Sequence, residues 1–497
     1  MLKFIFGFTL IFLPLFVQAQ TFEKTISVPQ PQEKDNRYFY IPFDVPQNAK
    51  SLTVSYDYDK KGGANVLDLG VFDARFDVAE ANIKGFRGWS GGRRSSIFIS
   101  ENSATNGYVA GKIPAGTWRV ALGLYKVAPE GVEVTVRVKF GDVDAGLLKE
   151  PFEEENKSFT LPIFKKLPAP GTFGGYTWFR GDLHLHTFHS DGTWTIPMIL
   201  SWAEGAGFNF VGLSEHNTSS HHAKIDSLAK NYKHLLVLRS EEVTTYGGHF
   251  NVWGLPSGEL IDFRVKPKDT KRLQTVVDAV HRLGLIASLN HPTARCGGCD
   301  WSYGDWQMMD SVEIWNGGWD AEDEAALKHW DELLQKGIRL TVTGASDSHT
   351  PPLGANPPPN ARPIGFPTNH VGMKNLTQQD LFKAIRRGRV WIGGLPTDYN
   401  LEFSALNAGK RLNIGEAAQV SDKAIRLDYK AKNFPGGASI SLISNGQVLQ
   451  TDKIEEAEYV LAKTFNVEKD SYFRLEVRDA TSAMLALTNP IYIQIKK

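Results

Sequence analysis

Strands and helices alternate through the middle of this chain, from about Tyr176 to Gly394, and this alternation limits the possible fold more than any other feature. Short apolar runs bounded by turn residues predict buried strands at 210–213, 235–238, 285–289 and 340–342. Amphipathic spacing predicts helices at 195–208, 269–283 and 320–336. Thr195 can cap the first helix, and Pro197 suits its first turn. Such alternation implies parallel strands, and closure into a barrel would account for the number of repeats.

The two flanks of the chain show a period-two pattern instead. Apolar and polar residues alternate at 52–58 and 132–138, and again at 425–429 and 473–477. Alternation with frequent turns is typical of antiparallel sandwiches, and Asn445-Gly446 is a strong hairpin signal. We therefore expect an α/β chain with a sandwich-like all-β domain on each side of the barrel. The expected divisions are 20–149 and 397–497 for the β domains, 150–175 for a linker and 176–396 for the barrel.

The first nineteen residues predict export. Lys3 precedes an apolar run from Phe4 to Val17, and small residues at Val17 and Ala19 suit a signal peptidase. The run is short for a membrane span and Pro14 would kink it, although a signal anchor is the alternative. We predict a signal peptide at 1–19, no membrane span after its cleavage, and a periplasmic or extracellular protein.

The charge of the chain is balanced. Acidic and basic residues number 55 each among 497 residues, so no whole-chain field favours nucleic acid or an anionic membrane. A small molecule is therefore the expected partner in preference to a long nucleic acid, and no oligomeric state follows from the sequence.

The chain has two cysteines, Cys296 and Cys299, in the sequence Arg-Cys-Gly-Gly-Cys-Asp. A structural zinc site needs four ligands, and no second cysteine pair exists. A redox pair normally opens a helix, whereas the two intervening glycines favour a loop. We predict a local disulfide, with a redox pair as the alternative.

Histidines and carboxylates gather where the predicted strands end. His184 and His186 stand two apart on a strand, so that both imidazoles lie on one face, and Asp347 and His349 repeat the spacing. The ends of parallel barrel strands converge on one mouth, where so many buried polar groups would be costly without metal ions. The nine candidate metal ligands are His184, His186, Asp191, His216, Glu242, His249, His291, Asp347 and His349.

These residues stand in motifs that resemble the PHP superfamily (polymerase and histidinol phosphatase), and more closely its CehA/McbA-type metallohydrolases. The segment Gly85-Phe-Arg-Gly-Trp-Ser-Gly-Gly-Arg-Arg also looks like the leader region of exported members. Each short motif is weak, but the ordered set is specific and covers the barrel region. The motifs, in the order of the family, are Trp178-Phe-Arg-Gly-Asp-Leu-His-Leu-His-Thr, His189-Ser-Asp-Gly, Glu242-Val-Thr-Thr, Gly248-His-Phe-Asn-Val, Asn290-His-Pro and Ala345-Ser-Asp-Ser-His.

The resemblance implies a distorted (β/α)7 TIM-like barrel with three neighbouring metal sites. The first metal would be bound by His184, His186, Glu242 and Asp347. Glu242 would bridge to a second metal on His249 and His291, and the third would lie on Asp191, His216 and His349. Glu241 is the alternative to Glu242, and Ser240 stands where the family usually has glycine. The implied cofactor is two or three divalent ions of zinc, manganese or iron, because imidazole with carboxylate suits all three.

Such a cluster suits a secreted hydrolase of phosphate mono- or diesters. Two neighbouring metals can hold a bridging hydroxide and neutralise the oxygens of an in-line displacement, so that no separate side-chain base is needed. Arg295 is a candidate phosphate clamp, or else a solvated loop charge. Asn217 and Asn316 could orient substrate or equally cap turns. The stretch from Pro351 to Pro367 is crowded with glycine and proline and is a candidate active-site loop.

Two other functions are open at this point. The same hydroxide could attack a carboxylic or carbamate ester, as the carbaryl-hydrolysing branch of the family suggests. Tryptophans near the mouth would suit an aromatic leaving group, or would simply pack the barrel; they are Trp301, Trp306, Trp315 and Trp319. The second alternative is an exported protein that captures metal or glycan without turnover.

Overall fold

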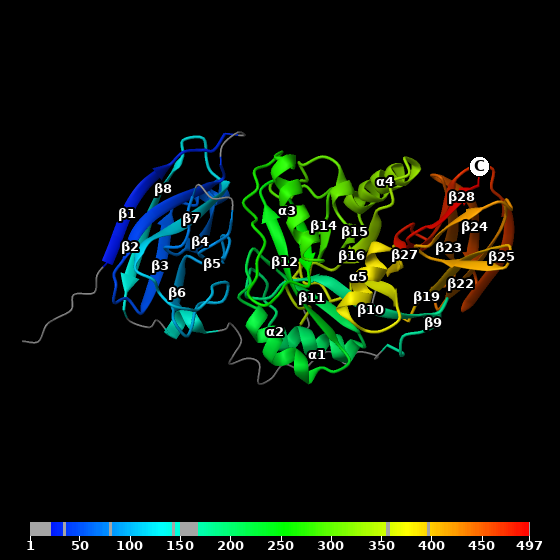
Figure 1. Ribbon diagram of the computed structural model, residues 1–497, viewed down its shortest axis with the longest axis horizontal. Helices are drawn as coiled ribbons and strands as arrows, with labels where there is room; N and C mark the ends of the chain where they lie inside the picture. Colours follow the sequence, from blue (N-terminus) through cyan, green and yellow to red (C-terminus); the bar gives the residue numbers. More distant parts are fainter. Residues whose placement is uncertain are drawn as a thin grey trace, which may run out of the picture.

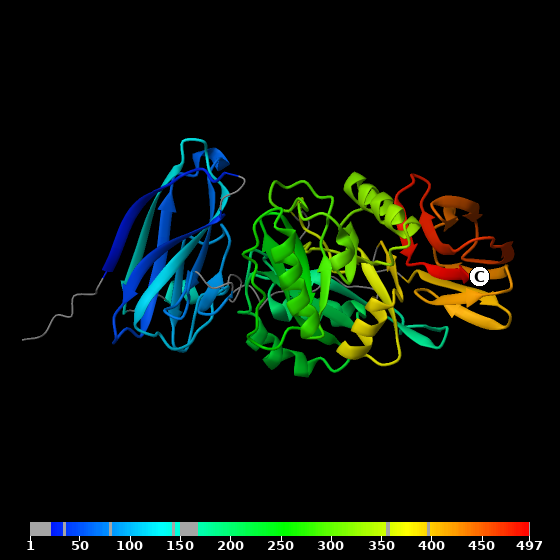
Figure 2. The same cartoon turned by 45° about the horizontal axis from the view of Figure 1, so that its top comes forward.

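The computed structural model describes residues 21–32, 36–78, 82–141, 145–149, 167–353, 358–394 and 398–496. They form three bodies in a row, with the chain running from one end of the row to the other (Figures 1 and 2). The predicted signal peptide and the part of the predicted linker at 150–166 lie outside the described residues. Within the described residues, none of the helices combines the length and the apolar character of a membrane span.

The first body consists of the strands β1 (Thr21–Val28), β2 (Tyr38–Val45), β3 (Ser51–Tyr58), β4 (Val66–Phe72), β5 (Phe86–Trp89), β6 (Ser96–Ser100), β7 (Gly116–Lys126) and β8 (Val132–Phe140). They pair into two four-stranded sheets, in the orders β1-β8-β3-β6 and β2-β7-β4-β5. Every pairing is antiparallel. Alternate side chains such as Val54 and Val136 are fully buried between the sheets, which explains the period-two pattern.

The second body is a mixed α/β unit, the class that the strand–helix alternation predicts. Its strands are β9 (Thr172–Phe173), β10 (Tyr176–Leu185), β11 (Phe210–His216), β12 (Leu236–Thr245), β13 (Gly248–Trp253), β14 (Ile286–Leu289), β15 (Ser311–Asn316), β16 (Thr341–Ala345), β17 (Thr368–Met373) and β18 (Val390–Gly393). β10 to β16 are neighbours in chain order, and β17 and β18 extend the sheet beyond β10. β10, β11 and β12 are parallel, and so are β14, β15 and β16.

The prediction of a closed, all-parallel barrel is wrong in two respects. β13 runs antiparallel to both neighbours, because only Tyr246 and Gly247 separate it from β12 and so short a connection forms a hairpin. The sheet is also open, because the antiparallel β17 pairs with the first half of β10 along the edge that β16 would need for closure. β16 reaches β10 only beyond its own end, through an isolated bridge between Leu185 and Ser348. The sheet is therefore curved enough to bring strand ends together without closing.

The α-helices of the described residues are α1 (Ile196–Ala206), α2 (His222–Leu228), α3 (Thr270–Arg282), α4 (Ala321–Gln335) and α5 (Gln378–Arg386). The three predicted helices are confirmed as α1, α3 and α4. The side chain of Thr195 accepts a hydrogen bond from the backbone N–H of Met198, and the side chain of Asp269 caps α3 in the same way. α2 and α5 were not predicted; α2 has seven residues and no side-chain cap, so its sequence carries little helix signal.

The third body is made of strands that form two sheets. One contains β19 (Asn400–Asn407), β20 (Lys410–Asn413), β22 (Ala424–Lys432) and β25 (Glu458–Asn466). The other contains β21 (Ala417–Val420), β23 (Ala438–Ser444), β24 (Gln447–Ile454), β26 (Ser471–Arg478), β27 (Met484–Thr488) and β28 (Ile491–Ile495). Asn445 and Gly446 join β23 to β24 with φ angles of 49° and 75°, as expected of the predicted hairpin. β27 also pairs with β18, so the second sheet is continuous with the central sheet.

Candidate metal centre

Three groups of potential metal ligands lie where the central strands end, and the ligand atoms of each group are all within 4.8 Å of one another. The structure thus brings all nine sequence-predicted ligand residues to one mouth of the curved sheet. His186 belongs to two groups and lies between them. The groups are His184, His186 and Asp347; Glu242, His249 and His291; and His186, Asp191, His216 and His349.

Glu242 lies at the centre of the cluster. Its Oε2 is 3.5 Å from Nε2 of His184 and 3.5 Å from Nε2 of His186. Its Oε1 is 3.1 Å from Nδ1 of His249 and 3.4 Å from Nε2 of His291. A single carboxylate therefore contacts two of the groups, as a bridging ligand would.

The neighbouring Glu241 points to the opposite face of β12, as the alternation of a strand requires. It is fully buried, and its Oε2 accepts a hydrogen bond of 2.7 Å from the backbone N–H of Ile261. Glu241 is therefore not part of the cluster, and of the two candidate carboxylates the structure places Glu242 there.

The cluster fits metal cations better than it fits hydrogen bonding within the protein. Among the described residues, buried polar atoms without a hydrogen-bond partner concentrate in it. Each such atom costs about 1–3 kcal/mol if it remains unsatisfied. Four of these atoms face one another across 3.1–3.5 Å, so cations between them would satisfy several at once. These four are Nε2 of His184, Nε2 of His186, Oε2 of Glu242 and Oδ1 of Asp347; Nδ1 of His186 and Nδ1 of His291 also have no hydrogen-bond partner among the described residues.

The electrostatics of the cluster attract positive charge. Burial opposes ionisation of Asp347, yet the neighbouring His184 and His349 hold its pKa well below the usual range. Burial likewise opposes protonation of His349, yet Asp191 and Asp347 raise its pKa to about 10. Burial lowers the pKa of His186 to about 3, with His349 and His216 acting in the same direction, so this ring is a neutral ligand. Ionised carboxylates around a neutral imidazole are what a divalent cation requires.

Two of the candidate ligands have strained backbones. His291 and Asp347 follow the ends of β14 and β16 with φ angles of 26° and 49°, in the left-handed region that non-glycine residues rarely adopt. Such a conformation costs on the order of 1–3 kcal/mol and concentrates at functional sites. The side chain of Asn290 supports the end of β14, because it donates to Oε1 of Glu242 at 2.9 Å and accepts from the backbone N–H of Asn251 at 3.1 Å.

A buried carboxylate that the sequence did not reveal holds one of the ligands. Oε1 of Glu313, on β15, lies 2.9 Å from Nδ1 of His184. A histidine that donates Nδ1–H to a carboxylate presents the lone pair of Nε2, and Nε2 of His184 points into the cluster. Asn251 also donates to Glu313, at 3.3 Å. Glu313 is therefore a positioning residue for His184.

Replacing Glu313 with glutamine is expected to weaken metal binding by about 10- to 100-fold, because the fixed tautomer and the basicity of His184 both depend on the carboxylate. Competition with a chromophoric chelator measures the affinity. Glu322→Gln is the matched control, since Glu322 lines the same pocket but is exposed. Equal metal affinity in Glu313→Gln and the wild type would contradict the positioning role.

The pocket over the cluster has a volume of about 460 Å³ and contains one arginine and no lysine among the described residues that line it. That residue is Arg362, in the glycine- and proline-rich loop that the sequence marked as a candidate active-site loop. Its Nη1 donates to Oδ1 of Asn316 at 3.2 Å and to the carbonyl of Ser346 at 3.4 Å. The predicted clamp, Arg295, is exposed and does not line the pocket. Arg362, and not Arg295, is therefore the arginine that lies beside the cluster in the described residues.

The two predicted asparagines have different positions. Asn316 lines the pocket and holds Arg362. Asn217 lies outside the pocket lining, has a φ of 49°, and exchanges hydrogen bonds with the backbone of Thr244. It caps a turn, which was the alternative interpretation. The four tryptophans pack into the core around the sheet, and the described pocket lining does not include them: Trp301, Trp306, Trp315 and Trp319.

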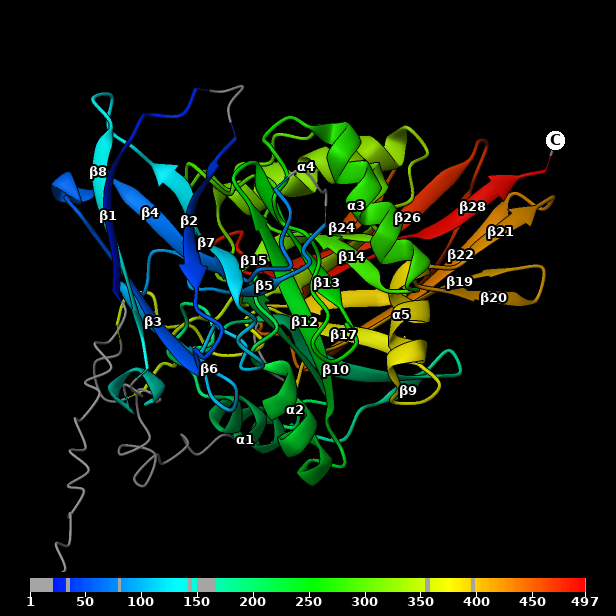
Figure 3. The same ribbon diagram turned by 60° about the vertical axis from the view of Figure 1, so that its left-hand side comes forward.

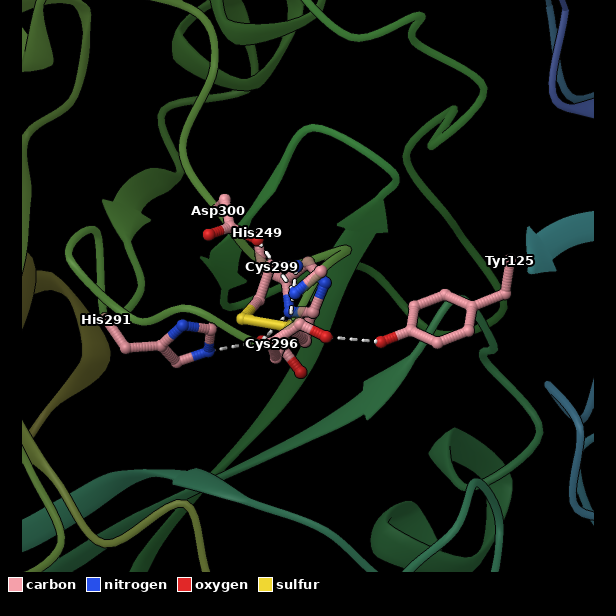
Figure 4. The surroundings of a disulfide bond; sticks show 8 residues. Tyr125, His249, His291, Cys296, Cys299 and Asp300 are labelled. Carbon is pink, nitrogen blue, oxygen red and sulfur yellow. Dashed lines mark hydrogen bonds and ion pairs between the residues drawn. A yellow bond between two sulfur atoms is a disulfide. The ribbon is translucent and has the colours of Figure 1, made fainter. Parts of the chain in front are cut away.

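The predicted disulfide between Cys296 and Cys299 is present and forms part of the pocket wall. Figure 4 shows His249 and His291 close to it, with Tyr125 reaching the same loop from the N-terminal sandwich. The hydroxyl of Tyr125 donates to the carbonyl of Cys296 at 2.9 Å. The sandwich, which comes forward in Figure 3, thus supports one wall of the site.

The N-terminal sandwich also holds the loop that carries Asp191. Nη1 of Arg93 donates to the carbonyl of Asp191 at 2.7 Å, and Nη1 of Arg94 donates to the carbonyl of Ser190 at 3.0 Å. Both arginines belong to the segment that resembles the leader region of exported PHP proteins. The first body is therefore a structural part of the metal centre.

No family model and no curated protein matches the sequence. Among solved structures, the chain is similar to a two-domain protein from Bacteroides vulgatus ATCC 8482 containing a predicted PHP-like metal-dependent phosphoesterase. The identity is 17%, the match covers 67% of this chain and 100% of that one, and the TM-score is 0.40. An amidohydrolase from Chromobacterium violaceum, with bound sulfate and no metal, shows 14% identity over 37% of this chain and 93% of that one, with a TM-score of 0.25.

Both TM-scores lie below 0.5, so these likenesses do not define the class of the protein. Its own side chains do. Nine histidine and carboxylate side chains cluster at the strand ends of a curved α/β sheet, and several of their buried ligand atoms have no hydrogen-bond partner. This combination defines a divalent-metal site.

Proposed function

We propose that this chain is an exported PHP-type metal-dependent phosphoesterase of the CehA/McbA kind, acting on a small-molecule phosphate mono- or diester. The observation that carries the proposal is the cluster of nine potential metal ligands with Arg362 beside it. Arg362 is the one arginine among the described residues that line the pocket. The order of the sequence motifs supports the choice of family. The apolar run at residues 4–17, which predicts a signal peptide at 1–19, supports export.

The residues of the chain divide the expected work between them. Two or three divalent ions of zinc, manganese or iron would activate a water and neutralise charge on the oxygens of the ester. Glu313 orients His184, and the sandwich arginines hold the loop of Asp191. Arg362, held by Asn316, would bind a non-bridging oxygen of the phosphate with its remaining N–H groups.

A carboxylic or carbamate ester hydrolase loses the support of the tryptophans, because none of the four belongs to the described lining of the pocket. The resemblance to the carbaryl-hydrolysing branch of the family keeps it as the alternative.

Turnover on three substrates tests the proposal. The metal-loaded protein is assayed on nitrophenyl phosphate, bis-nitrophenyl phosphate and nitrophenyl acetate, with Asp347→Asn as the blank. We expect turnover of the mono- or diester that is absent from the blank. Turnover of the acetate alone would assign the protein to carbonyl-ester hydrolysis, and no turnover of any substrate would favour metal or glycan capture.

Replacing Arg362 with alanine is expected to lower kcat/KM for the preferred phosphate ester by about 10²- to 10³-fold, because one charge-assisted donor to the transition state is lost. Arg295→Ala is the matched control and should retain wild-type turnover, since Arg295 is exposed and lies outside the pocket lining. The reverse order of effects would restore Arg295 as the clamp.

A further inference from the structure

A second cavity, of about 200 Å³, lies between the central sheet and the C-terminal domain. It shares no lining residue with the pocket of the metal centre. Trp178 and Arg180 line it from β10, on the same strand face as His184 and His186 but nearer the start of the strand. The cavity therefore lies at the opposite end of β10 from the metal ligands. His370 and Trp391 complete the side of the central sheet, and Asn400 and Asn433 belong to the side of the C-terminal domain.

Arg180 is buried in the wall of this cavity and forms no salt bridge with a carboxylate of the described residues. It is 5% exposed, its Nη2 donates to the carbonyl of Pro168, and its buried Nε has no hydrogen-bond partner among the described residues. Two other buried arginines of this chain are each paired: Arg474 lies 2.8 Å from Asp331, and Arg87 lies 3.6 Å from Asp73. A third, Arg389, has no carboxylate partner among the described residues, but its Nε donates to the carbonyl of Gly372, whereas Nε of Arg180 has no acceptor. A buried guanidinium that lacks such a partner is costly unless an anion is brought to it.

The other side chains of the wall do not provide that anion. The ring of His370 stacks on Trp391, with centroids 3.5 Å apart and planes 11° apart. Burial lowers the pKa of His370 well below its usual value, and Arg180 acts in the same direction, so the ring is neutral. Asp398 lines the cavity, but no salt bridge joins it to Arg180 in the described residues. The wall thus presents two positive charges, Arg180 and Lys432, beside the one carboxylate Asp398. Lys432 lies 3.9 Å from Glu458, so Arg180 is the cation of the wall that has no carboxylate partner among the described residues.

We propose that this cavity binds a small oxyanion, a phosphate or a short carboxylate, with Arg180 as its counter-ion. The volume suits an ion of this size and excludes a large polyanion. A bound oxyanion would contact the central sheet and the C-terminal domain together, and would stabilise their junction by mass action. This site is independent of the metal centre and of the phosphoesterase activity.

Titration calorimetry on the full, metal-stripped protein tests the site, with inorganic phosphate, acetate and citrate as separate ligands. Removing the metals prevents phosphate from binding to them. We expect millimolar or tighter binding of at least one ligand, weakened roughly tenfold or more by Arg180→Met, because a charge-assisted hydrogen bond is lost. Arg389→Met is the matched control, since Arg389 is equally buried but donates to the carbonyl of Gly372 and does not line the cavity.

A second pair of variants decides the result if Arg180→Met does not fold. Gly171 lines the cavity, is exposed, and has open space at the position of a Cβ atom. Gly171→Asp places a carboxylate at the cavity and should abolish binding, whereas the isosteric Gly171→Asn should bind as the wild type does. Equal affinity in Gly171→Asp and Gly171→Asn, or no binding of any of the three ligands to the wild type, would overturn the proposal.

Discussion

Asp347→Asn is expected to lower turnover of nitrophenyl phosphate by at least about a thousandfold, because residues that act as one catalytic unit lose function together. Oδ1 of Asp347 lies 3.4 Å from Nε2 of His184 and 3.1 Å from Nε2 of His186. The amide keeps the volume of the carboxylate but removes the charge that holds a cation there. Asparagine also tolerates the left-handed backbone at this position, so the fold should persist.

Asp320→Asn is the matched control for that variant. Asp320 lines the same pocket, but its side chain caps α4, and asparagine is an equally good capping residue. We expect near wild-type turnover and an unchanged melting temperature. Wild-type turnover in Asp347→Asn would contradict the role of the cluster, and equal losses in both variants would point to a general effect of charge in the pocket.

Removal of the metals is expected to lower the melting temperature by about 10 °C. Free metal at a thousand times its dissociation constant stabilises the folded state by about 4 kcal/mol. For a unit of about 200 residues, 1 kcal/mol shifts the melting temperature by roughly 2–4 °C. Scanning calorimetry before and after chelation measures the shift. In His186→Ala, which removes the ligand shared by two groups, chelation should have a much smaller effect.

The stabilisation by metal should increase with pH. Despite burial, Glu242 and Asp191 raise the pKa of His216 to about 9, and Asp191 and Asp347 raise that of His349 to about 10. Both rings are protonated near neutral pH in the metal-free protein, so a metal must displace their protons. The difference in melting temperature between loaded and chelated protein should grow as the pH rises towards these values. A difference that is independent of pH, or no difference at all, would contradict binding at these histidines.

The sequence predicted the nine candidate ligands because each stands next to a recognisable strand end or motif. Glu313 and Arg362 had no such signal. Glu313 is the one charged residue of the short strand β15. Only its 2.9 Å contact with His184, from 129 positions earlier in the chain, shows its role. Arg362 lies in an irregular loop, where no periodicity relates position in the sequence to position in space. Contacts of this range depend on tertiary packing.

The mixed α/β centre, three helices and the Asn445-Gly446 hairpin followed from local patterns. The open edge of the barrel could not be predicted from such patterns, because the pairing of a strand edge depends on residues far away in the chain. β17 lies almost 190 residues from β10 and pairs with the first half of its free edge. The continuity of the central and C-terminal sheets depends on the pairing of β18 with β27, which is also long-range, since the paired residues lie more than 90 positions apart. Residues at 391–393 carry no signal that distinguishes this partner from any other strand.

The divalent-metal content of the purified protein tests the central claim most directly. After reconstitution with manganese or zinc and removal of free metal, elemental analysis should find two or three ions per chain, one for each group that is filled. The content should fall in His186→Ala, which removes a ligand from two groups. Less than one ion per chain in the wild type, or the same content in the variant, would contradict the assignment of these residues as a metal centre.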